Sequence, residues 1–211
     1  MRFGKFEPVS PFLDQTDFLL TDGNVLIRVL GKDPEHAVRL ERESLLLASL
    51  DQPSVPKAIE FGEVEAEGTL YYSMQLPGPL SLPKPRDPSC VMRLLLLVSR
   101  ALADLHGAGV VYRKVAPSGI ALTIDGEPIL YDFSRATRMS HKYGAVQSGV
   151  PELSVGIEAD LFGLRTLGES LSRGMELRGT PLGEALEYMK ADSVLRRVNS
   201  LSELVHFLEQ H

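Results

Sequence analysis

The order of apolar runs along the 211 residues predicts an α+β chain, with a small sheet lobe followed by a larger, mainly helical lobe. Three observations support this prediction. The first third of the chain holds short β-branched and apolar runs interrupted by one helical repeat. A proline-rich stretch follows, and segments with helical spacing dominate the remainder.

Strands and one helix are expected in the first third of the chain. Turn signals such as Asp22-Gly23-Asn24 and Glu67-Gly68 separate the apolar runs. Leucines between His36 and Leu50 recur at helical spacing, and Pro53 ends that helix. The expected strands cover residues 6–12, 17–20, 25–30, 58–64 and 69–76.

The second part begins after a connector. Residues 77–88 contain five prolines, a composition typical of a link between lobes. The next helix is strong and ends at Gly107 and Gly109. Asp125-Gly126 separates two short apolar runs, which indicates a hairpin. The expected helices cover residues 89–106, 158–172, 182–190 and 201–208, and the hairpin covers residues 120–131.

These boundaries predict one domain over residues 1–211. Its first lobe is expected at 1–76, the connector at 77–88 and its second lobe at 89–211. Ser200 and Glu203 form an S-x-x-E capping box at the start of the last helix.

Composition narrows the classes of function. The formal net charge is -6, which argues against a nucleic-acid or anionic-membrane binder. Cys90 is the one cysteine, so a disulfide framework and a cysteine-rich zinc site are excluded within one chain and a reducing cytoplasm is expected. Its thiol is expected to be half-buried. The N-terminus lacks a long apolar run and residues 94–98 are too short to cross a bilayer, so neither a signal peptide nor a membrane span is expected. No feature indicates an oligomer.

Four segments, in this order, resemble the signature set of the protein kinase superfamily. They are VLIR at 25–28, RESLLLASLDQPSVPKAIEFG at 42–62, ADLHGAGVVYRKVAPSGIAL at 103–122 and YDFSRA at 131–136. The chain looks like a degenerate bacterial-type serine/threonine protein kinase, that is, a pseudokinase. The resemblance implies a protein-kinase-like bilobal fold, with a small antiparallel β-sheet N-lobe carrying helix C and a truncated, mainly helical C-lobe.

The resemblance also marks departures at the catalytic positions. Lys114 stands where a kinase carries the catalytic-loop aspartate, and an ammonium is a poor proton acceptor. Gly119 replaces the metal-binding asparagine, and Ala116 replaces the lysine of the same loop. Arg28 takes the place of the third-strand lysine, and a guanidinium is not equivalent to an ammonium. Asp132 is left as the one plausible cation ligand, which makes a weak magnesium site.

The nucleotide site that the resemblance implies is also altered. Residues 9–18 contain no glycine where kinases have a glycine-rich loop over the phosphates, and Phe12 or Leu13 is expected to fold into the empty cleft. Leu26 adds bulk where adenine would lie. The vestigial cleft is expected to contain Leu26, Arg28, Glu43, Met74, Ala121 and Asp132.

Structural roles follow from the same resemblance. Asp160 is expected to hold the backbone at Tyr112 and Arg113 by hydrogen bonds, and Phe133 to pack between the lobes. A further hypothesis is that Arg28, Glu43, Lys114 and Asp132 form a closed charge network, with Lys114 in place of magnesium. The nearest match to the kinase A-P-E motif is Val150-Pro151-Glu152, with Arg196 or Arg197 as a candidate partner for Glu152.

The leading functional hypothesis is a catalytically impaired kinase-like domain that binds a protein partner as a scaffold or regulator, with no cofactor. An atypical ATP-dependent kinase or phosphotransferase is the alternative, since Arg28, Glu43 and Asp132 keep charged groups at kinase positions. A nucleotide sensor without transfer is a third hypothesis, against which Leu26 and the glycine-free loop argue. ATP and magnesium are expected only under these alternatives.

Overall fold

The structure is a computed structural model that describes residues 2–13, 15–21, 23–30, 34–64, 68–139, 157–189 and 201–210. The chain forms two compact units, and each is built from two stretches of sequence. The first unit contains residues 1–82 and 121–134, and the second contains residues 83–120 and 135–211. Within the described residues, no helix is both long enough and apolar enough to cross a membrane.

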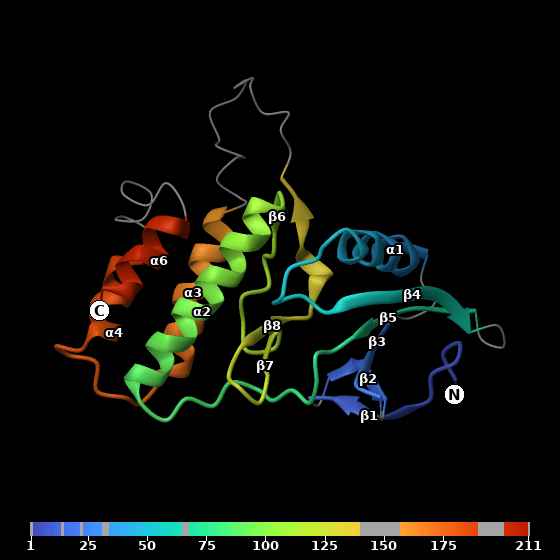
Figure 1. Cartoon of the computed structure of the whole chain (residues 1–211), viewed down its shortest axis with the longest axis horizontal. Helices are drawn as coiled ribbons and strands as arrows, with labels where there is room; N and C mark the ends of the chain where they lie inside the picture. The colour runs from blue at the N-terminus through green and yellow to red at the C-terminus, as the bar shows by residue number, and fades with distance from the viewer. Residues whose placement is uncertain are drawn as a thin grey trace, which may run out of the picture. The chain divides into compact units, whose positions relative to one another are not determined.

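The first unit is built on a five-stranded antiparallel sheet with the strand order β1-β2-β3-β5-β4 (Figure 1). One helix, α1, packs against β4 and β5. The elements are β1 (Pro8–Phe12), β2 (Gln15–Thr21), β3 (Val25–Val29), α1 (Pro34–Ala48), β4 (Lys57–Val64) and β5 (Thr69–Gln75). All six lie within a few residues of the positions expected from the sequence.

The two faces of this sheet bury different groups, because side chains alternate along a strand. On one face, Val25 and Ile27 of β3 pack with Tyr71 and with Phe3 from the N-terminal segment. On the other face, Leu26 lies opposite Met74 and Arg28 lies opposite Tyr72. The second face is the one that meets α1, so β3 places its single cation under that helix.

The N-terminal segment covers the first face of the sheet. Phe3 and Phe6 form a backbone bridge around Gly4, which has a positive φ of 56°. The ring of Phe3 meets Tyr71 edge-on at 5.4 Å between centroids. A side chain at Gly4 would lie 2.6 Å from Glu60 Oε1, so both the backbone conformation and the space favour glycine.

The hairpin of β7 (Ile120–Leu122) and β8 (Pro128–Leu130) groups with the first unit. The backbone N–H of Leu130 donates to Ser54 O at 2.8 Å, and Ser81 N donates to Leu122 O at 2.9 Å. These bonds tie residues 121–134 to the sheet unit, whereas the sequence placed them in the second lobe. The break at residues 82 and 83 lies within the expected connector.

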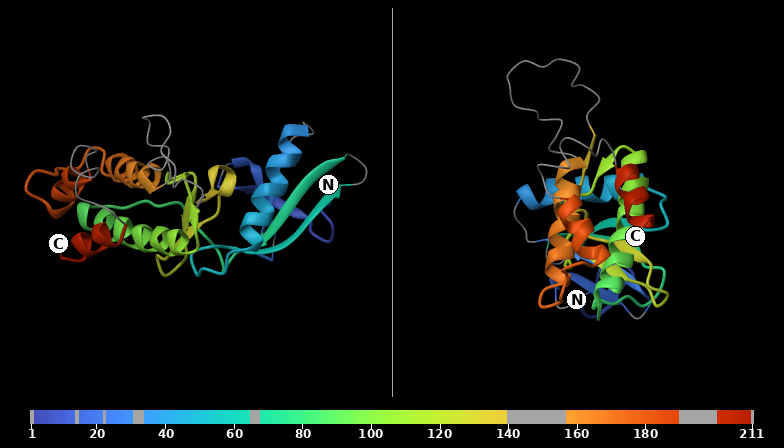
Figure 2. Two further views of the ribbon diagram at one scale, coloured as in Figure 1. Left: turned by 90° about the horizontal axis from the view of Figure 1, so that it is seen from above. Right: turned by 90° about the vertical axis from the view of Figure 1, so that its left-hand side faces the viewer.

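The second unit is mainly helical. Its central helix, α2, packs against α3, α4 and α6, which lie around it (Figures 1 and 2). A short two-stranded sheet joins β6 to β9. The elements are α2 (Pro88–Gly107), β6 (Val110–Val111), β9 (Thr137–Arg138), α3 (Ile157–Leu171), α4 (Pro181–Tyr188) and α6 (Leu201–Glu209). The 3-10 turn η1 (Phe133–Arg135) crosses from the first unit to the second.

The start of α2 corrects one expectation. Asp87 caps the helix by accepting a hydrogen bond from Cys90 N at 2.9 Å. Cys90 therefore sits in the first turn and is exposed, so the prediction of a half-buried thiol is wrong. The apolar run further along the helix, which includes Leu94, Leu95 and Val98, is buried.

Three predicted features lie outside the described residues. They are the Val150-Pro151-Glu152 motif, its pairing with Arg196 or Arg197, and the Ser200 half of the capping box.

Candidate functional site

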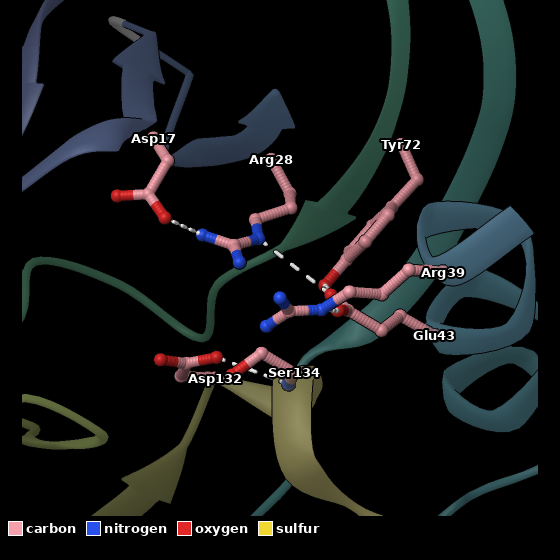
Figure 3. A network of polar contacts seen from close by, with 7 residues as sticks. All are labelled: Asp17, Arg28, Arg39, Glu43, Tyr72, Asp132 and Ser134. Atoms are coloured by element: carbon pink, nitrogen blue, oxygen red, sulfur yellow. Dashed lines mark hydrogen bonds and ion pairs between the residues drawn. The ribbon is translucent and has the colours of Figure 1, made fainter. Parts of the chain in front are cut away.

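The centre of the candidate site is Arg28, a buried cation in the middle of β3. Its side chain is 3% exposed. Its Nη1 group donates to the carboxylate of Asp17 on β2, and its Nε lies 3.6 Å from Glu43 Oε2 on α1 (Figure 3). The guanidinium carbon lies 4.5 Å from the centre of the Phe18 ring, a cation–π distance. The expected pairing of Arg28 with Glu43 is therefore present, and Asp17 is an additional partner.

The charge of Arg28 is maintained by its neighbours. Burial lowers the pKa of Arg28, but the nearby Tyr72, Glu43, Asp132 and Asp17 outweigh it, and the pKa lies above its ordinary value. A cation that is desolvated in this way stays charged because acidic groups surround it.

Glu43 is shared by two arginines. Its side chain is fully buried, and Oε1 accepts from Arg39 Nε at 3.0 Å, one turn earlier on α1. Tyr72 OH donates to Oε2 at 3.3 Å. Burial raises the pKa of Glu43 above its usual range, although Arg28 and Arg39 oppose that rise. Burial likewise raises the pKa of Tyr72, with the Glu43 charge adding to the effect. The phenol therefore stays protonated and can act as a donor to the carboxylate.

Asp132 follows β8 and is 4% exposed. Its Oδ1 accepts from Ser134 N at 3.0 Å, which caps the start of the turn η1 (Figure 3). Its proximity is one of the causes that raise the pKa values of Arg28 and Glu43. Among the described residues, no group of three or more histidine, cysteine, aspartate or glutamate side chains is arranged to hold a metal ion.

Aromatic rings fill the space beside this network. Phe12 and Phe18 are buried, and both meet Tyr131 edge-on, at 5.1 and 5.3 Å between ring centroids. Phe12 is one of the two residues expected to turn inward from the glycine-free segment. Leu26 is completely buried within the same unit. Met74, Ala121 and Phe133 are also buried completely.

In the second unit, Asp160 of α3 organises the loop that resembles the catalytic loop. Its fully buried carboxylate accepts from Tyr112 N at 3.0 Å and from Arg113 N at 2.6 Å. These are the hydrogen bonds expected for it. A third contact, 2.8 Å to His106 Nε2, was not expected. Arg113 has a positive φ of 60°, a conformation that costs energy for a residue with a side chain and that these bonds offset.

The same loop leaves no room for a side chain at position 119. A Cβ built on Gly119 would lie 2.8 Å from Lys114 Cγ and would overlap the Lys114 carbonyl oxygen. The hydroxyl of Tyr112 donates to the Gly119 carbonyl, which fixes this close approach. The hypothesis of an ion pair between Lys114 and Asp132 joins residues of the two units and stays a prediction.

Gly119→Asn, which would restore the asparagine of the kinase motif, is expected to lower the free energy of unfolding by about 1–3 kcal/mol, because the added atoms overpack the loop. Thermal or urea unfolding measures the loss. Gly107→Ala is the matched control, since a Cβ at Gly107 meets nothing within 4 Å. A Gly119→Asn variant as stable as the parent would show that the loop can widen.

Four residues of these two networks were missed by the sequence analysis: Asp17, Arg39, Tyr72 and His106. Arg39 had a usable signal, because it lies four residues before Glu43 and such pairs face each other on a helix. Asp17 had none, because its contact depends on the register that sets Phe18 opposite Arg28.

Comparison with known proteins independently supports the resemblance to protein kinases. The chain is 29% identical over 119 residues to the serine/threonine-protein kinase PknE of Mycobacterium bovis, a match that covers 54% of this chain and 21% of PknE. It is 29% identical over 165 residues to the serine/threonine-protein kinase PknA of Mycobacterium tuberculosis, covering 68% of this chain and 38% of PknA. The matches thus span only about a fifth to two fifths of these relatives. No protein-family profile matches the chain. The sequence matches, together with an α+β fold of a five-stranded sheet unit and a helical unit, identify the chain as a homologue of the serine/threonine kinases of the protein kinase superfamily.

Proposed function

We propose that the chain is a catalytically impaired protein-kinase-like domain that acts by binding a protein partner, as a scaffold or regulator. The observation that carries this proposal is the loop held by Asp160. It offers the ammonium of Lys114 where a kinase has its proton acceptor, and it is packed so that position 119 has no space for a metal-binding side chain. Kinase catalysis depends on positioning and electrostatic stabilisation, so a loop without these groups provides little of either.

The first unit supports the same proposal. The nucleotide-facing cation of a kinase has its counterpart in Arg28, and here Asp17 and Glu43 already engage it. Phe12 is buried against Tyr131 rather than exposed in a glycine-rich loop. The contact with Asp17 occupies a donor of Arg28 that would otherwise be open to phosphate.

An atypical kinase is the second candidate. The observation in its favour is that the Arg28–Glu43 pair is formed and that the charge of Asp132 acts on both residues. In active kinases, the corresponding pair must be in place for phosphoryl transfer. A nucleotide sensor would rest on the same contacts.

The test uses the full chain with radiolabelled ATP and either magnesium or manganese, with the protein itself and a generic protein as acceptors. We expect no phosphoryl transfer above the level of an Asp132→Ala control. Robust transfer that Asp132→Ala abolishes would overturn the proposal in favour of the atypical kinase.

A thermal-shift series with ATP and divalent cations separates the remaining candidates. A ligand at about 100 times its Kd stabilises a protein by about 2.7 kcal/mol, which for a chain of this size corresponds to a rise in Tm of about 5–10 °C. We expect no such rise. A rise without phosphoryl transfer would support the sensor.

A further inference from the structure

We propose that Asp17 is an internal substitute for a phosphate anion. Its carboxylate occupies the position beside Arg28 that an anion from solution would take, and its removal opens an anion-binding site. This inference rests on the proposed function, because it explains how a kinase-like cation is satisfied when no nucleotide binds.

The burial of the two acidic partners shows which side of Arg28 an external anion could reach. The Glu43 side chain is 0% exposed, so the Nε side of Arg28 is closed by protein. The Asp17 side chain is 45% exposed, although the arginine that it contacts is 3% exposed. The Nη1 donor of Arg28 therefore meets a partner that water can reach, whereas its Nε lies beside a partner that water cannot reach.

Asp17 is one of three carboxylates, with Glu43 and Asp132, whose charges act on Arg28, so an anion in its place would keep the charge balance of the network. Two cations, Arg28 and Arg39, both contact the Glu43 carboxylate (Figure 3). Arg39 is 42% exposed, so it can also meet a group arriving from water. Without Asp17, the Nη1 donor of Arg28 would lose its acceptor. A buried charged donor without an acceptor is costly, and phosphate oxygens match the planar fork of arginine.

The position of Asp17 on β2 explains why its carboxylate, and not an anion from solution, occupies the site beside Arg28. It lies on β2 beside Phe18, and Phe18 is paired in the sheet with Arg28. The Phe18 ring also packs on the guanidinium of Arg28 and on Tyr131. Because Asp17 is tethered to the strand that pairs with β3, its carboxylate has a high effective concentration beside Arg28. It also repels any second anion near Arg28.

The test measures the affinity for inorganic phosphate, without divalent cations, by isothermal titration calorimetry on the full chain. We expect Asp17→Ala to bind phosphate at least about tenfold more tightly than the parent, because one repelling charge is removed and one donor is released. Asp17→Asn should give a smaller gain, since the amide oxygen still accepts from Arg28. The double variant Asp17→Ala with Arg28→Met should lose the gain.

Asp51→Ala is the matched control. Asp51 is an exposed acidic residue of the same unit, 3.8 Å from Lys57, and its removal changes the net charge by the same amount. Equal phosphate affinity in the parent and in both Asp17 variants would overturn the inference, as would an equal gain in Asp51→Ala. If Asp17→Ala does not fold, as judged by circular dichroism, Asp17→Asn decides the outcome alone. Phosphoryl transfer from ATP by the parent would overturn the proposed function without bearing on this comparison.

Discussion

Arg28→Met should lower the free energy of unfolding by about 3 kcal/mol or more. Methionine replaces the length of the side chain but removes the charge, and Glu43 then stays fully buried with Arg39 as its remaining cationic partner. Removing one member of a buried ion pair typically costs about 3–5 kcal/mol, because the other charge is left poorly compensated. Urea unfolding followed by circular dichroism measures the loss.

The control for Arg28→Met is Arg2→Met. Arg2 lies in the same unit, and its pair with Glu7 is largely exposed, with 76% of its own side chain accessible. We expect a change of less than about 0.5 kcal/mol there. The double variant Arg28→Met with Glu43→Met should regain much of the lost stability, since a well-packed apolar pair can replace a buried ion pair. A loss below about 1 kcal/mol for Arg28→Met would mean that Arg39 alone satisfies Glu43.

Asp160→Ala should also destabilise the chain by about 3–5 kcal/mol, through the second unit. The substitution removes the acceptor of Tyr112 N, Arg113 N and His106 Nε2 together. Buried donors that lose their acceptor cost about 1–3 kcal/mol each. The left-handed backbone of Arg113 also loses the contact that offsets its strain.

Glu169→Ala is the control for Asp160→Ala, because it removes one carboxylate from the same helix. Glu169 pairs with Arg165 at 2.8 Å and its side chain is 48% exposed, so we expect a loss below about 0.5 kcal/mol. The loss of stability for Asp160→Asn should lie between these two values, since the one oxygen of its amide can accept from only some of the three donors. Unfolding by urea is again the measurement, and similar losses for Asp160→Ala and Glu169→Ala would contradict the organising role of Asp160.

Most elements of the fold could be predicted because their signals are local. The helix in the first unit was expected at 36–50 and is found at Pro34–Ala48, since leucine spacing and a following proline mark it directly. The strand expected at 25–30 is found at Val25–Val29, because its β-branched apolar run is also a local signal. The hairpin was also predicted, and it groups with the first unit. Its place depends on hydrogen bonds to Ser54 and Ser81, which no local pattern encodes.

The site was predictable where the kinase resemblance names a position. Arg28 with Glu43, and Asp160 with the backbone of its loop, follow from that resemblance and are found as contacts. The contacts of Asp17 and His106 were not predicted, because they depend on which side chains the folded backbone brings within reach. Cys90 was misjudged because the end of the connector places it at an exposed helix start.

The division of the first unit between two stretches of sequence bears on how the protein folds during synthesis. The five strands leave the ribosome before the hairpin, yet Phe12 and Phe18 find their ring partner only when Tyr131 emerges, after the whole of α2 has been made. Contacts so distant in sequence form late and slowly. A nascent chain that stalls before residue 121 would present these rings to water, and such a fragment should depend on chaperones and be prone to aggregate. For the same reason, a chain cut after residue 82 would contain the five-stranded sheet but not residues 121–134, and would therefore lack part of the first unit.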